Sequence, residues 1–470
     1  MPGSLVGAGA RVSNGVMSAS KPHVLILGGG YVGLYTARGL QKRLSSVPMT
    51  ITLVEPNAYM TYQPLLPEVA GGEVEPRNVT VQLRRALRKV DLFRGRLQAL
   101  DCGSKTATLI SLDGEISTTR YEHVVVALGA ITRTFPTPGL EENGIGFKTI
   151  EEALYLRNRV LDSIARAAST NDPAERTKAL TFVFIGGGYT GVEAIAELSD
   201  LSKIAIRMYP TLTSSQLNWV LLEAADRVAV EVGPILSRWT LSHLINRGID
   251  VRLKTTMQSC IDGHVVLSDG DTFPADTIVW TAGMKPNPIL DSTDFPRGPK
   301  GHVSANTKLQ VIQDDGTVID GAWAAGDNAQ VPDLTAAKQP AYYPANAQNA
   351  VRQAKVLAKN LTAHIQAGEL VEYRHKSMGT LASYGVGKGA AVVFGIRLKG
   401  LPAWLVDRGY HGMSMPTYAR KFRILTGWAI NLFTPRDLTP MTATERPRQV
   451  FVNGMKASEK TEPTSKADGK

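Results

Sequence analysis

The stretch Val24-Leu-Ile-Leu-Gly-Gly-Gly-Tyr-Val-Gly33 decides the fold, because an apolar run breaks into the pattern GxGxxG and continues as a helical pattern over residues 34–40. Strand, glycine-rich turn and helix in this order are typical of a dinucleotide-binding unit. Gly28 permits the tight turn, Gly30 lets the backbone approach a pyrophosphate, and Gly33 lets the helix pack on the strand. The helix N-terminus attracts phosphates. The stretch therefore predicts a dinucleotide site.

An acidic residue, Glu55, follows the next predicted strand, which covers residues 51–54. It stands about 20 residues after Gly33, the separation at which such units place the acid that accepts a hydrogen bond from a ribose 2′-hydroxyl. A glycine-rich turn in another kind of α/β domain is the plainer alternative, but strand, turn, helix and acid occur together here. Glu55 is therefore predicted to bind a ribose.

The composition is that of a folded chain with several domains. Its 470 residues leave room for about three domains of ordinary size, and 43% of them are hydrophobic. The net charge of +10 indicates an acidic partner, which can be a phosphate-rich cofactor, an anionic membrane surface or nucleic acid. Zinc-finger and RNA-recognition patterns are absent from the sequence, so we expect no nucleic acid partner.

Cysteine usage restricts the redox chemistry. Cys102 and Cys260 are the only cysteines and lie in different predicted units, so the sequence contains neither a disulfide framework nor a CxxC pair. Redox chemistry must then use a bound cofactor, and no metal site is predicted. No window approaches 18 uninterrupted apolar residues, which argues against a transmembrane helix and leaves attachment to a membrane surface open.

Both ends of the chain are predicted to be disordered. Residues 1–22 are rich in Gly, Ser and Ala and lack the apolar core of a secretory signal, although a weak organelle transit peptide remains an alternative. Residues 446–470 end in the charged stretch KASEKTEPTSKADGK.

Two stretches of the first half suit contact with a ligand. Residues 59–72 are apolar with two prolines and are predicted to form a loop without regular structure, either a packed connection or a wall against a flat cofactor ring. The predicted buried strand 122–130 ends in small residues, Ala127 and Gly129, which permit close approach of the backbone to a ligand.

The opening pattern occurs a second time. A predicted buried strand over residues 180–185 is followed by Gly186-Gly-Gly-Tyr-Thr-Gly191 and then by a helical pattern. Gly186, Gly188 and Gly191 repeat the spacing of the first turn. A chance duplicate with the same order of elements is improbable, so we predict two dinucleotide sites, one in each of two nucleotide-binding domains.

The acid of the second unit is predicted to be Glu231, at the end of a strand over residues 227–230. It lies 40 residues after Gly191, and residues 208–217 are interpreted as an insertion. If Glu231 holds the ribose 2′-hydroxyl, its charge repels a 2′-phosphate, and NADH is preferred over NADPH. A preference for NADPH is the alternative.

The later part of the chain repeats the strand endings of the first half. Residues 276–284 mirror the strand at 122–130 and contain Gly283, whereas residues 321–328 are predicted to form a strand followed by an exposed acid, Asp327.

A helix is predicted to begin near Pro344. Its small residues form one face, from which Gln348 and Arg352 project on adjacent turns. The small residues of this face are Ala345, Ala347, Ala350, Val351 and Ala354.

Together these patterns resemble the flavoproteins with two dinucleotide-binding domains. The resemblance spans residues 23–360 and rests on the two GxGxxG units, the strands ending in Ala-Leu-Gly-Ala and Thr-Ala-Gly, and the final Ala-x-Gly-Asp. It implies that the first unit binds FAD, that the second binds NAD(P)H, and that Asp327 contacts the ribityl or pyrophosphate region of FAD. Without a CxxC pair, disulfide reductases and sulfide:quinone oxidoreductases fit poorly.

Four stretches resemble more narrowly the type II NADH dehydrogenases, the single-chain NADH:quinone oxidoreductases of respiratory chains that pump no protons. They are residues 62–71, Gly191-Val-Glu193, Ala347-Gln348-x-Ala350 and residues 376–380. The resemblance implies that Glu193 lies beside the flavin and the nicotinamide. It also places Gln348 on the helix that meets the isoalloxazine and the quinone pocket.

The resemblance has one departure. The family usually shows AQxAxQ on this helix, and Arg352 replaces the second Gln. Arg352 can hydrogen-bond a quinone carbonyl or stabilise a reduced anion, or it can indicate a different acceptor or a solvated helix charge. Glu193 has the alternative of a residue that only complements the helix dipole.

From Ile396 onward, aromatic residues alternate with Arg and Lys. This pattern suits an amphipathic helix in a membrane interface, attracted to anionic head groups, with a core helix or a dimer interface as the alternative. In the family that the chain resembles, this region both dimerises and docks to the membrane. The residues are Trp404, Arg408, Tyr410, Tyr418, Arg420, Lys421, Phe422, Arg423, Trp428 and Phe433.

The predicted fold class is α/β, with two Rossmann-type domains and a C-terminal membrane-associating amphipathic helical segment. We expect a discontinuous FAD domain over 23–150 and 300–370, an NADH domain over 151–299, and a membrane-docking and dimerisation segment over 371–445. The predicted reaction passes hydride from NADH to FAD and then two electrons to a membrane quinone.

The predicted partners are NADH, a membrane quinone, an anionic membrane surface and a second copy of the chain. The expected location is peripheral, on the cytoplasmic face of the cell membrane, with the mitochondrial inner membrane or the soluble cytoplasm as alternatives. Two other functions remain open: a soluble NAD(P)H reductase of the ferredoxin-reductase kind, and a flavin-dependent sensor or interaction protein.

Overall fold

The structure, a computed structural model, describes residues 21–442, 448, 449, 451–453 and 455. The predicted leader, residues 1–22, therefore lies almost entirely outside the described residues. The same holds for much of the predicted tail, although its described residues have helical conformation.

Buried apolar runs form a first sheet of six strands in the order β21-β22-β9-β1-β2-β5. Neighbouring strands are parallel except at the edge, where β21 pairs antiparallel with β22. Runs of Val, Ile and Leu suit such strands because both faces of the sheet are covered. The strands are β1 (His23–Leu27), β2 (Thr50–Val54), β5 (Asp91–Phe93), β9 (His123–Val126), β21 (Gln310–Ile312) and β22 (Val318–Ala324).

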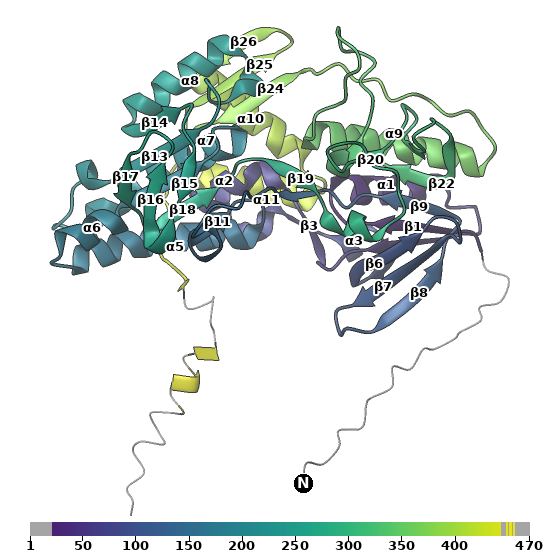
Figure 1. The fold of residues 1–470 in the computed structure, drawn as a ribbon, viewed down its shortest axis with the longest axis horizontal. Helices are drawn as coiled ribbons and strands as arrows, with labels where there is room; N and C mark the ends of the chain where they lie inside the picture. The colour runs from purple at the N-terminus through teal and green to yellow at the C-terminus, as the bar shows by residue number, and fades with distance from the viewer. Residues whose placement is uncertain (1–20, 443–447, 450, 454, 456–470) are drawn as a thin grey trace, which may run out of the picture.

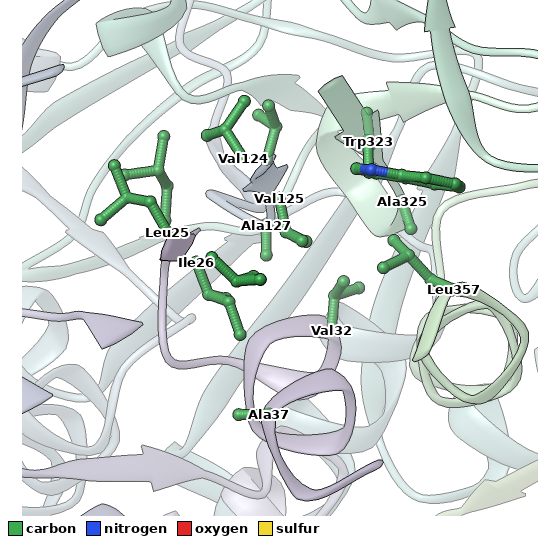
Figure 2. Packing of buried hydrophobic residues seen from close by; sticks show 14 of the residues in the cluster. Leu25, Ile26, Val32, Ala37, Val124, Val125, Ala127, Trp323, Ala325 and Leu357 are labelled. Carbon is green, nitrogen blue, oxygen red and sulfur yellow. The ribbon is translucent and has the colours of Figure 1, made fainter. Parts of the chain in front are cut away.

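Helices α1 (Tyr31–Arg43) and α9 (Ala347–Ile365) pack against each other on one face of this sheet. They approach closely because Gly39 has no side chain: a Cβ there would lie 2.5 Å from the Cβ of Ala358. Figure 2 shows Val32 of α1 and Leu357 of α9 projecting from the helices toward the strands. Since α9 lies far from α1 in sequence, this packing joins the two ends of the first domain.

Short elements occupy the connections of the first domain. β6, β7 and β8 form an antiparallel sheet, β3 pairs with β4, and β20 pairs with β23. Their bounds are β3 (Tyr59–Thr61), β4 (Thr80–Gln82), α3 (Leu83–Ala86), β6 (Gly95–Asp101), β7 (Thr106–Ser111), β8 (Ile116–Arg120), β20 (Val303–Ser304) and β23 (Ala329–Gln330).

The prediction of an irregular loop over residues 59–72 is wrong. After β3, residues 63–65 form a 3-10 turn and α2 covers Leu66–Ala70. Pro64 and Pro67 each lie in the first turn of their element, where a missing backbone N–H breaks no helical hydrogen bond. The prolines therefore start these elements instead of preventing them.

A second sheet of five parallel strands has the order β11-β18-β12-β13-β14. Its core includes the stacked rings of Phe182 and Trp219, whose centroids are 4.4 Å apart. The strands are β11 (Gly144–Gly146), β12 (Thr181–Ile185), β13 (Asn218–Glu223), β14 (Ile249–Leu253) and β18 (Thr277–Trp280). The two parallel sheets confirm the predicted α/β class with two Rossmann-type domains, and Figure 1 shows them on opposite sides of the molecule.

The remaining elements of the second domain are five helices and a small antiparallel sheet. They are α4 (Leu140–Asn143), α5 (Ile150–Ser169), α6 (Pro173–Ala179), α7 (Tyr189–Ala205), α8 (Pro234–Asn246), β15 (Met257–Ser259), β16 (His264–Leu267) and β17 (Thr272–Pro274).

The chain passes between the domains at two adjacent points. β10 (Ala130–Thr132) pairs antiparallel with β19 (Met284–Pro286), so the outward and return connections lie side by side. β11 already belongs to the second sheet, and Leu290 and Phe295 already pack in the core of the first domain. The second domain therefore begins and ends earlier in the chain than residues 151–299.

The C-terminal segment begins with three strands that the helical prediction for this segment did not include. β24 (Gly379–Ser383), β25 (Gly389–Val393) and β26 (Ile396–Lys399) form an antiparallel sheet, followed by α10 (Leu401–Ser414) and α11 (Tyr418–Asn431). Tyr384, after β24, is buried and its hydroxyl lies 3.0 Å from the Thr240 hydroxyl of α8. The sheet is thereby attached to the second domain.

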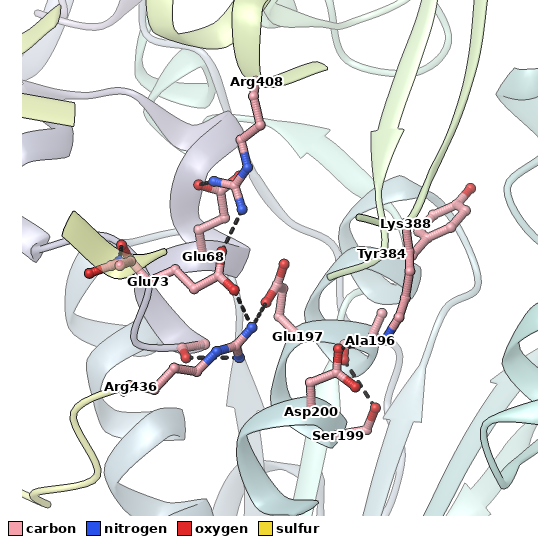
Figure 3. A network of polar contacts seen from close by, with 12 residues as sticks. Glu68, Glu73, Ala196, Glu197, Ser199, Asp200, Tyr384, Lys388, Arg408 and Arg436 are labelled. Atoms are coloured by element: carbon pink, nitrogen blue, oxygen red, sulfur yellow. Dashed lines mark hydrogen bonds and ion pairs between the residues drawn. The ribbon is translucent and has the colours of Figure 1, made fainter. Parts of the chain in front are cut away.

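A cluster of buried charges joins α2, α7, α10 and the segment after α11 (Figure 3). Arg408 of α10 forms ion pairs with Glu68 and Glu73, whereas Arg436 pairs with Glu73 and lies 3.4 Å from Glu197. Burial, with repulsion from Glu73, raises the pKa of Glu197 well above its usual range. Burial also raises the pKa of Glu68 to about 7, so the two guanidinium groups face less negative charge than three ionised carboxylates would carry.

We expect Arg408→Met to lower the free energy of unfolding by about 3–5 kcal/mol, because Glu68 and Glu73 lose the cation that they share. Urea unfolding followed by tryptophan fluorescence measures this change. Arg423→Met is the matched control: Arg423 is exposed on α11 and forms no ion pair in the described part of the chain. Its effect should stay below about 0.5 kcal/mol. Unchanged stability of Arg408→Met would contradict the role given to the cluster.

Candidate active site

A cavity of about 1640 Å³ lies between the two domains and is bordered by the C-terminal helices. Its walls come from α1, α7, α9, α10 and α11. A pocket for one drug-sized ligand measures about 300–1,000 Å³, so this cavity has room for more than one bound group. The predicted site residues that line it are Gly186, Gly188, Glu193, Glu231, Gly283, Asp327, Ala347, Gln348 and Arg352.

The first glycine turn has the geometry that its spacing predicts. A Cβ at Gly28 would lie 2.3 Å from the carbonyl oxygen of Ala127, and one at Gly33 would lie 1.8 Å from the carbonyl oxygen of Gly28. Gly30 begins α1 with no side-chain cap, and its Cβ position faces open space. The first N–H groups of α1 are therefore available to a phosphate.

Glu55 lies at the end of β2, next to this turn. Its carboxylate accepts hydrogen bonds from the backbone N–H groups of Gly29 at 2.7 Å and Asn57 at 2.9 Å. Together with Gly28 and Arg96, Glu55 lines a second cavity of about 370 Å³. The backbone thus orients the acid beside a space that suits the adenosine end of a dinucleotide.

Asp327 lies closer to the interior than the exposed position that we predicted. Burial raises the pKa of its carboxyl, and its Oδ1 is buried without a hydrogen-bond partner. Such an oxygen suits a hydroxyl donor from a ligand. The next residue, Asn328, accepts a hydrogen bond from the N–H of Gly129 at 2.9 Å and donates one to the carbonyl of Val126 at 3.1 Å. These contacts hold Asp327 against the end of β9.

The second glycine turn repeats this geometry. A Cβ at Gly191 would lie 1.9 Å from the carbonyl oxygen of Gly186, which has a φ of +111°. Gly188 begins α7 without a side-chain cap, so the helix N-terminus is again open. Gly283 follows β18, the strand of the second sheet that corresponds to β9, and has a φ of +75°. The two domains therefore present equivalent glycine turns, each followed by a helix N-terminus without a side-chain cap.

In the second unit, the acid that occupies the position equivalent to Glu55 is Glu223 and not Glu231. Glu223 ends β13 and accepts hydrogen bonds from the N–H groups of Gly187 at 2.6 Å and Ala225 at 2.7 Å. These are the same two contacts that Glu55 makes in the first unit. The predicted strand over 227–230 does not exist. The apolar run ending in Glu223, Asn218-Trp-Val-Leu-Leu-Glu223, was the signal in the sequence that indicated the correct strand.

Glu193 lies one turn into α7 and lines the cavity. Its carboxyl oxygen accepts a hydrogen bond from the N–H of Ser383, on β24, at 2.9 Å. Burial, followed by repulsion from Asp407, raises the pKa of Glu193 well above its usual range. Glu193 thus connects the second domain to the C-terminal sheet at the cavity.

Gln348 and Arg352 lie on adjacent turns of α9 and face the cavity together. The Gln348 side-chain oxygen lies 3.0 Å from Nε2 of His375. Nη1 of Arg352 donates a hydrogen bond to the backbone carbonyl oxygen of Gln348 at 3.3 Å. His375 belongs to no sequence motif that predicts a role in the site. It lies beside Gln348 only because the fold brings the two segments together. Lys148 also lines the cavity, and burial lowers its pKa.

Comparison with known proteins supplies an independent result. The family model for pyridine nucleotide-disulphide oxidoreductases matches residues 22–354. The probable NADH dehydrogenase of Dictyostelium discoideum is 25% identical over 424 residues, which cover 88% of this chain and 90% of the relative. The demethylphylloquinone reductase NdbB of Synechocystis sp. is 26% identical over 419 residues, which cover 88% and 96%.

A solved structure has the same fold. NDH2 from Plasmodium falciparum in complex with NADH aligns with a TM-score of 0.81 at 18% identity, covering 89% of this chain and all of that chain. The type II NADH:quinone oxidoreductase Ndh of Mycobacterium tuberculosis is 25% identical over 427 residues, which cover 88% of each chain.

We expect Glu223→Gln to raise the KM for NADH by about tenfold or more, because a charge-assisted hydrogen bond to a ribose hydroxyl contributes about 1.5–3 kcal/mol. Its preference for NADH over NADPH should also narrow, since the charge that repels a 2′-phosphate is gone. Steady-state kinetics with both nucleotides measures these changes, with Glu231→Gln as the matched variant. A larger effect at Glu231 would restore the assignment made from the sequence.

Proposed function

We propose that this chain, which belongs to the pyridine nucleotide-disulphide oxidoreductase family, is an FAD-dependent NADH:quinone oxidoreductase that pumps no protons. The observation that carries the proposal is the single cavity that extends from the second glycine turn to the face of Gln348 and Arg352. It brings a nucleotide site and an acceptor site to one cofactor position. Cys102 and Cys260 do not line it, so thiol chemistry at this site is excluded.

The first domain would hold FAD, which when bound accepts a hydride and releases electrons. The N–H groups at the start of α1 would bind its pyrophosphate and Glu55 a ribose hydroxyl. The unpaired oxygen of Asp327 would accept a hydrogen bond from the ribityl chain. These residues fit the cofactor because each offers an unused or correctly oriented polar group.

The second domain would bind and orient NADH. The open N-terminus of α7 would bind the pyrophosphate, and Glu223 a ribose hydroxyl. Glu193, one turn farther along α7, also lines the cavity, where its carboxyl, when protonated, can donate a hydrogen bond to the nicotinamide amide. The nicotinamide end would then face the centre of the cavity.

The end of the cavity near α10 and α11 suits a quinone ring. Tyr35, Val351, Met413 and Pro416 contribute apolar walls. Gln348 and the adjacent guanidinium of α9 supply hydrogen-bond donors for a carbonyl oxygen. An apolar slot with few polar groups is what a lipid-soluble acceptor requires.

The same two helices expose an apolar surface that we assign to membrane docking. None of the helices in the described part of the chain is long and apolar enough to cross a membrane. The exposed apolar residues of α10, of α11 and of the two positions after α11 are Leu401, Leu405, Met413, Tyr418, Phe422, Leu432 and Phe433. Of these, Met413 and Tyr418 also line the acceptor end of the cavity, where a peripheral enzyme would receive quinone.

Basic residues beside this surface favour an anionic leaflet, and Arg423 of α11 and Lys399 of β26 are both exposed. We assign the enzyme to the cytoplasmic face of the cell membrane. A homodimer is part of the proposal, and light scattering in detergent measures it.

With FAD bound, we expect the protein to oxidise NADH with a soluble quinone as acceptor. Gln348→Leu should lower kcat/KM for the quinone by about tenfold, because a hydrogen bond to the carbonyl is lost. Flavin absorbance in anaerobic stopped-flow separates reduction by NADH from reoxidation by quinone. FAD-loaded protein that NADH reduces but that no quinone reoxidises would refute the proposal.

We expect the double variant Phe422→Ser and Phe433→Ser to lose at least about tenfold in partitioning onto anionic vesicles, since burying a Phe side chain contributes about 1.5–3 kcal/mol. These side chains are 69% and 88% exposed. Met208→Ser is the control, because Met208 is 67% exposed on the second domain. Vesicle flotation measures the change. Equal losses in both variants would contradict docking through α11.

A further inference from the structure

Helix α10 carries a buried acid and a histidine one turn apart, beside the acceptor end of the cavity. Asp407 is 2% exposed, and its Oδ1 lies 3.4 Å from Nε2 of His411. That oxygen has no hydrogen-bond partner among the described residues. A buried carboxylate oxygen without a hydrogen bond lowers the stability of the folded protein. The position of this oxygen beside an imidazole therefore requires an explanation.

The other ring nitrogen of His411 faces a tyrosine. Nδ1 lies 3.0 Å from the hydroxyl of Tyr62, which is 4% exposed. The Tyr62 ring meets the ring of Tyr31, the first residue of α1, edge to face at 6.0 Å. His411, Tyr62 and Tyr31 all line the cavity. Asp407, His411 and Tyr62 therefore form a row that leads from the interior of α10 to the cavity wall.

The proposed reaction needs a proton donor at this place. NADH, one proton and a quinone give NAD⁺ and a quinol: the hydride carries two electrons and one proton, and the second proton comes from solvent. Gln348 has no titratable proton and the guanidinium of Arg352 does not ionise, so neither can supply it. An imidazole can take up and release a proton near neutral pH.

We propose that His411 supplies the proton that completes quinone reduction, that the Tyr62 hydroxyl passes it to the acceptor, and that Asp407 is a positioning residue. As the electron pair enters the quinone, the Tyr62 proton forms the new O–H bond with a quinone oxygen. The Nδ1 proton of His411 moves to the Tyr62 oxygen, and His411 is reprotonated from solvent. This inference rests on the proposed function, and two of its residues, Asp407 and His411, lie outside the stretches that carry the family resemblance.

Several groups on neighbouring elements face this row. Burial and repulsion from neighbouring tyrosines raise the pKa of Tyr62, so its hydroxyl stays protonated and able to donate. The groups are Tyr31 and Tyr35 of α1, Glu68 of α2, Tyr189 and Glu193 of α7, and Arg408 and Tyr410 of α10.

The test uses the FAD-loaded full chain with His411→Asn, Tyr62→Phe and Asp407→Asn. Anaerobic stopped-flow compares reoxidation of the reduced protein by a soluble quinone and by ferricyanide, which accepts electrons without protons. We expect His411→Asn and Tyr62→Phe to slow the quinone step by about 100-fold, as for loss of a general acid. Reduction by NADH and reoxidation by ferricyanide should remain within about twofold.

Two further readouts separate proton delivery from a structural role. In wild type the quinone step should slow as pH rises and in D₂O, and both effects should disappear in His411→Asn. Asp407→Asn should slow the step and keep its pH dependence, because the donor is still present but less well oriented. His364→Asn, remote from the cavity, is the matched control for a histidine replacement.

The outcomes are distinguishable. A wild type that reduces no quinone refutes the proposed function. If the wild type reduces quinone and the His411→Asn variant has the same rate and pH profile, only the assignment of His411 as proton donor is refuted. The same holds if His375→Asn removes the pH dependence instead. If His411→Asn fails to retain FAD, Tyr62→Phe and the conservative His411→Gln give the same two readouts.

Discussion

Both nucleotide sites depend on one steric constraint, the contact between a glycine in the first turn of a helix and the carbonyl of the glycine that begins the turn. A Cβ would come within 1.8 Å of this oxygen at Gly33 and within 1.9 Å at Gly191. Because no side chain intervenes, each helix starts directly at the end of its strand and presents free N–H groups. The acids that follow, Glu55 and Glu223, accept hydrogen bonds from these same turns and are thereby held beside them.

The C-terminal chain forms one wall of the cavity between the two domains. Helix α10 lies against the short α2 through ion pairs of Arg408 with Glu68 and Glu73, and the chain after α11 adds Arg436 to the same cluster. Buried charges of this kind contribute little net stability when complete, but a missing partner is costly. They therefore hold α10 in one position, and with it His411, which no nucleotide-binding motif contains.

Local motifs were sufficient to predict the glycine turns, Glu55 and the face of α9 that carries Gln348. Glu231 was chosen because the second strand of this unit was predicted at residues 227–230. The strand lies earlier, in the apolar run that ends in Glu223. The small sheet before α10 was missed because its short strands contain Gly, Ala and polar residues as well as apolar ones. These strands are stabilised by packing on α10 and on the second domain.

The sequence by itself determined the α/β class and the two glycine turns, because these depend on hydrophobic runs and glycine spacing within a few tens of residues. The assignment of FAD to the first turn and of NADH to the second came from the family resemblance that several motifs carry together. Only the tertiary structure decided which groups meet across the cavity. Tyr62 and His411 are separated by 349 residues, and His375 meets Gln348 from another segment. Such pairings depend on how distant elements pack, and no periodicity within either segment encodes them.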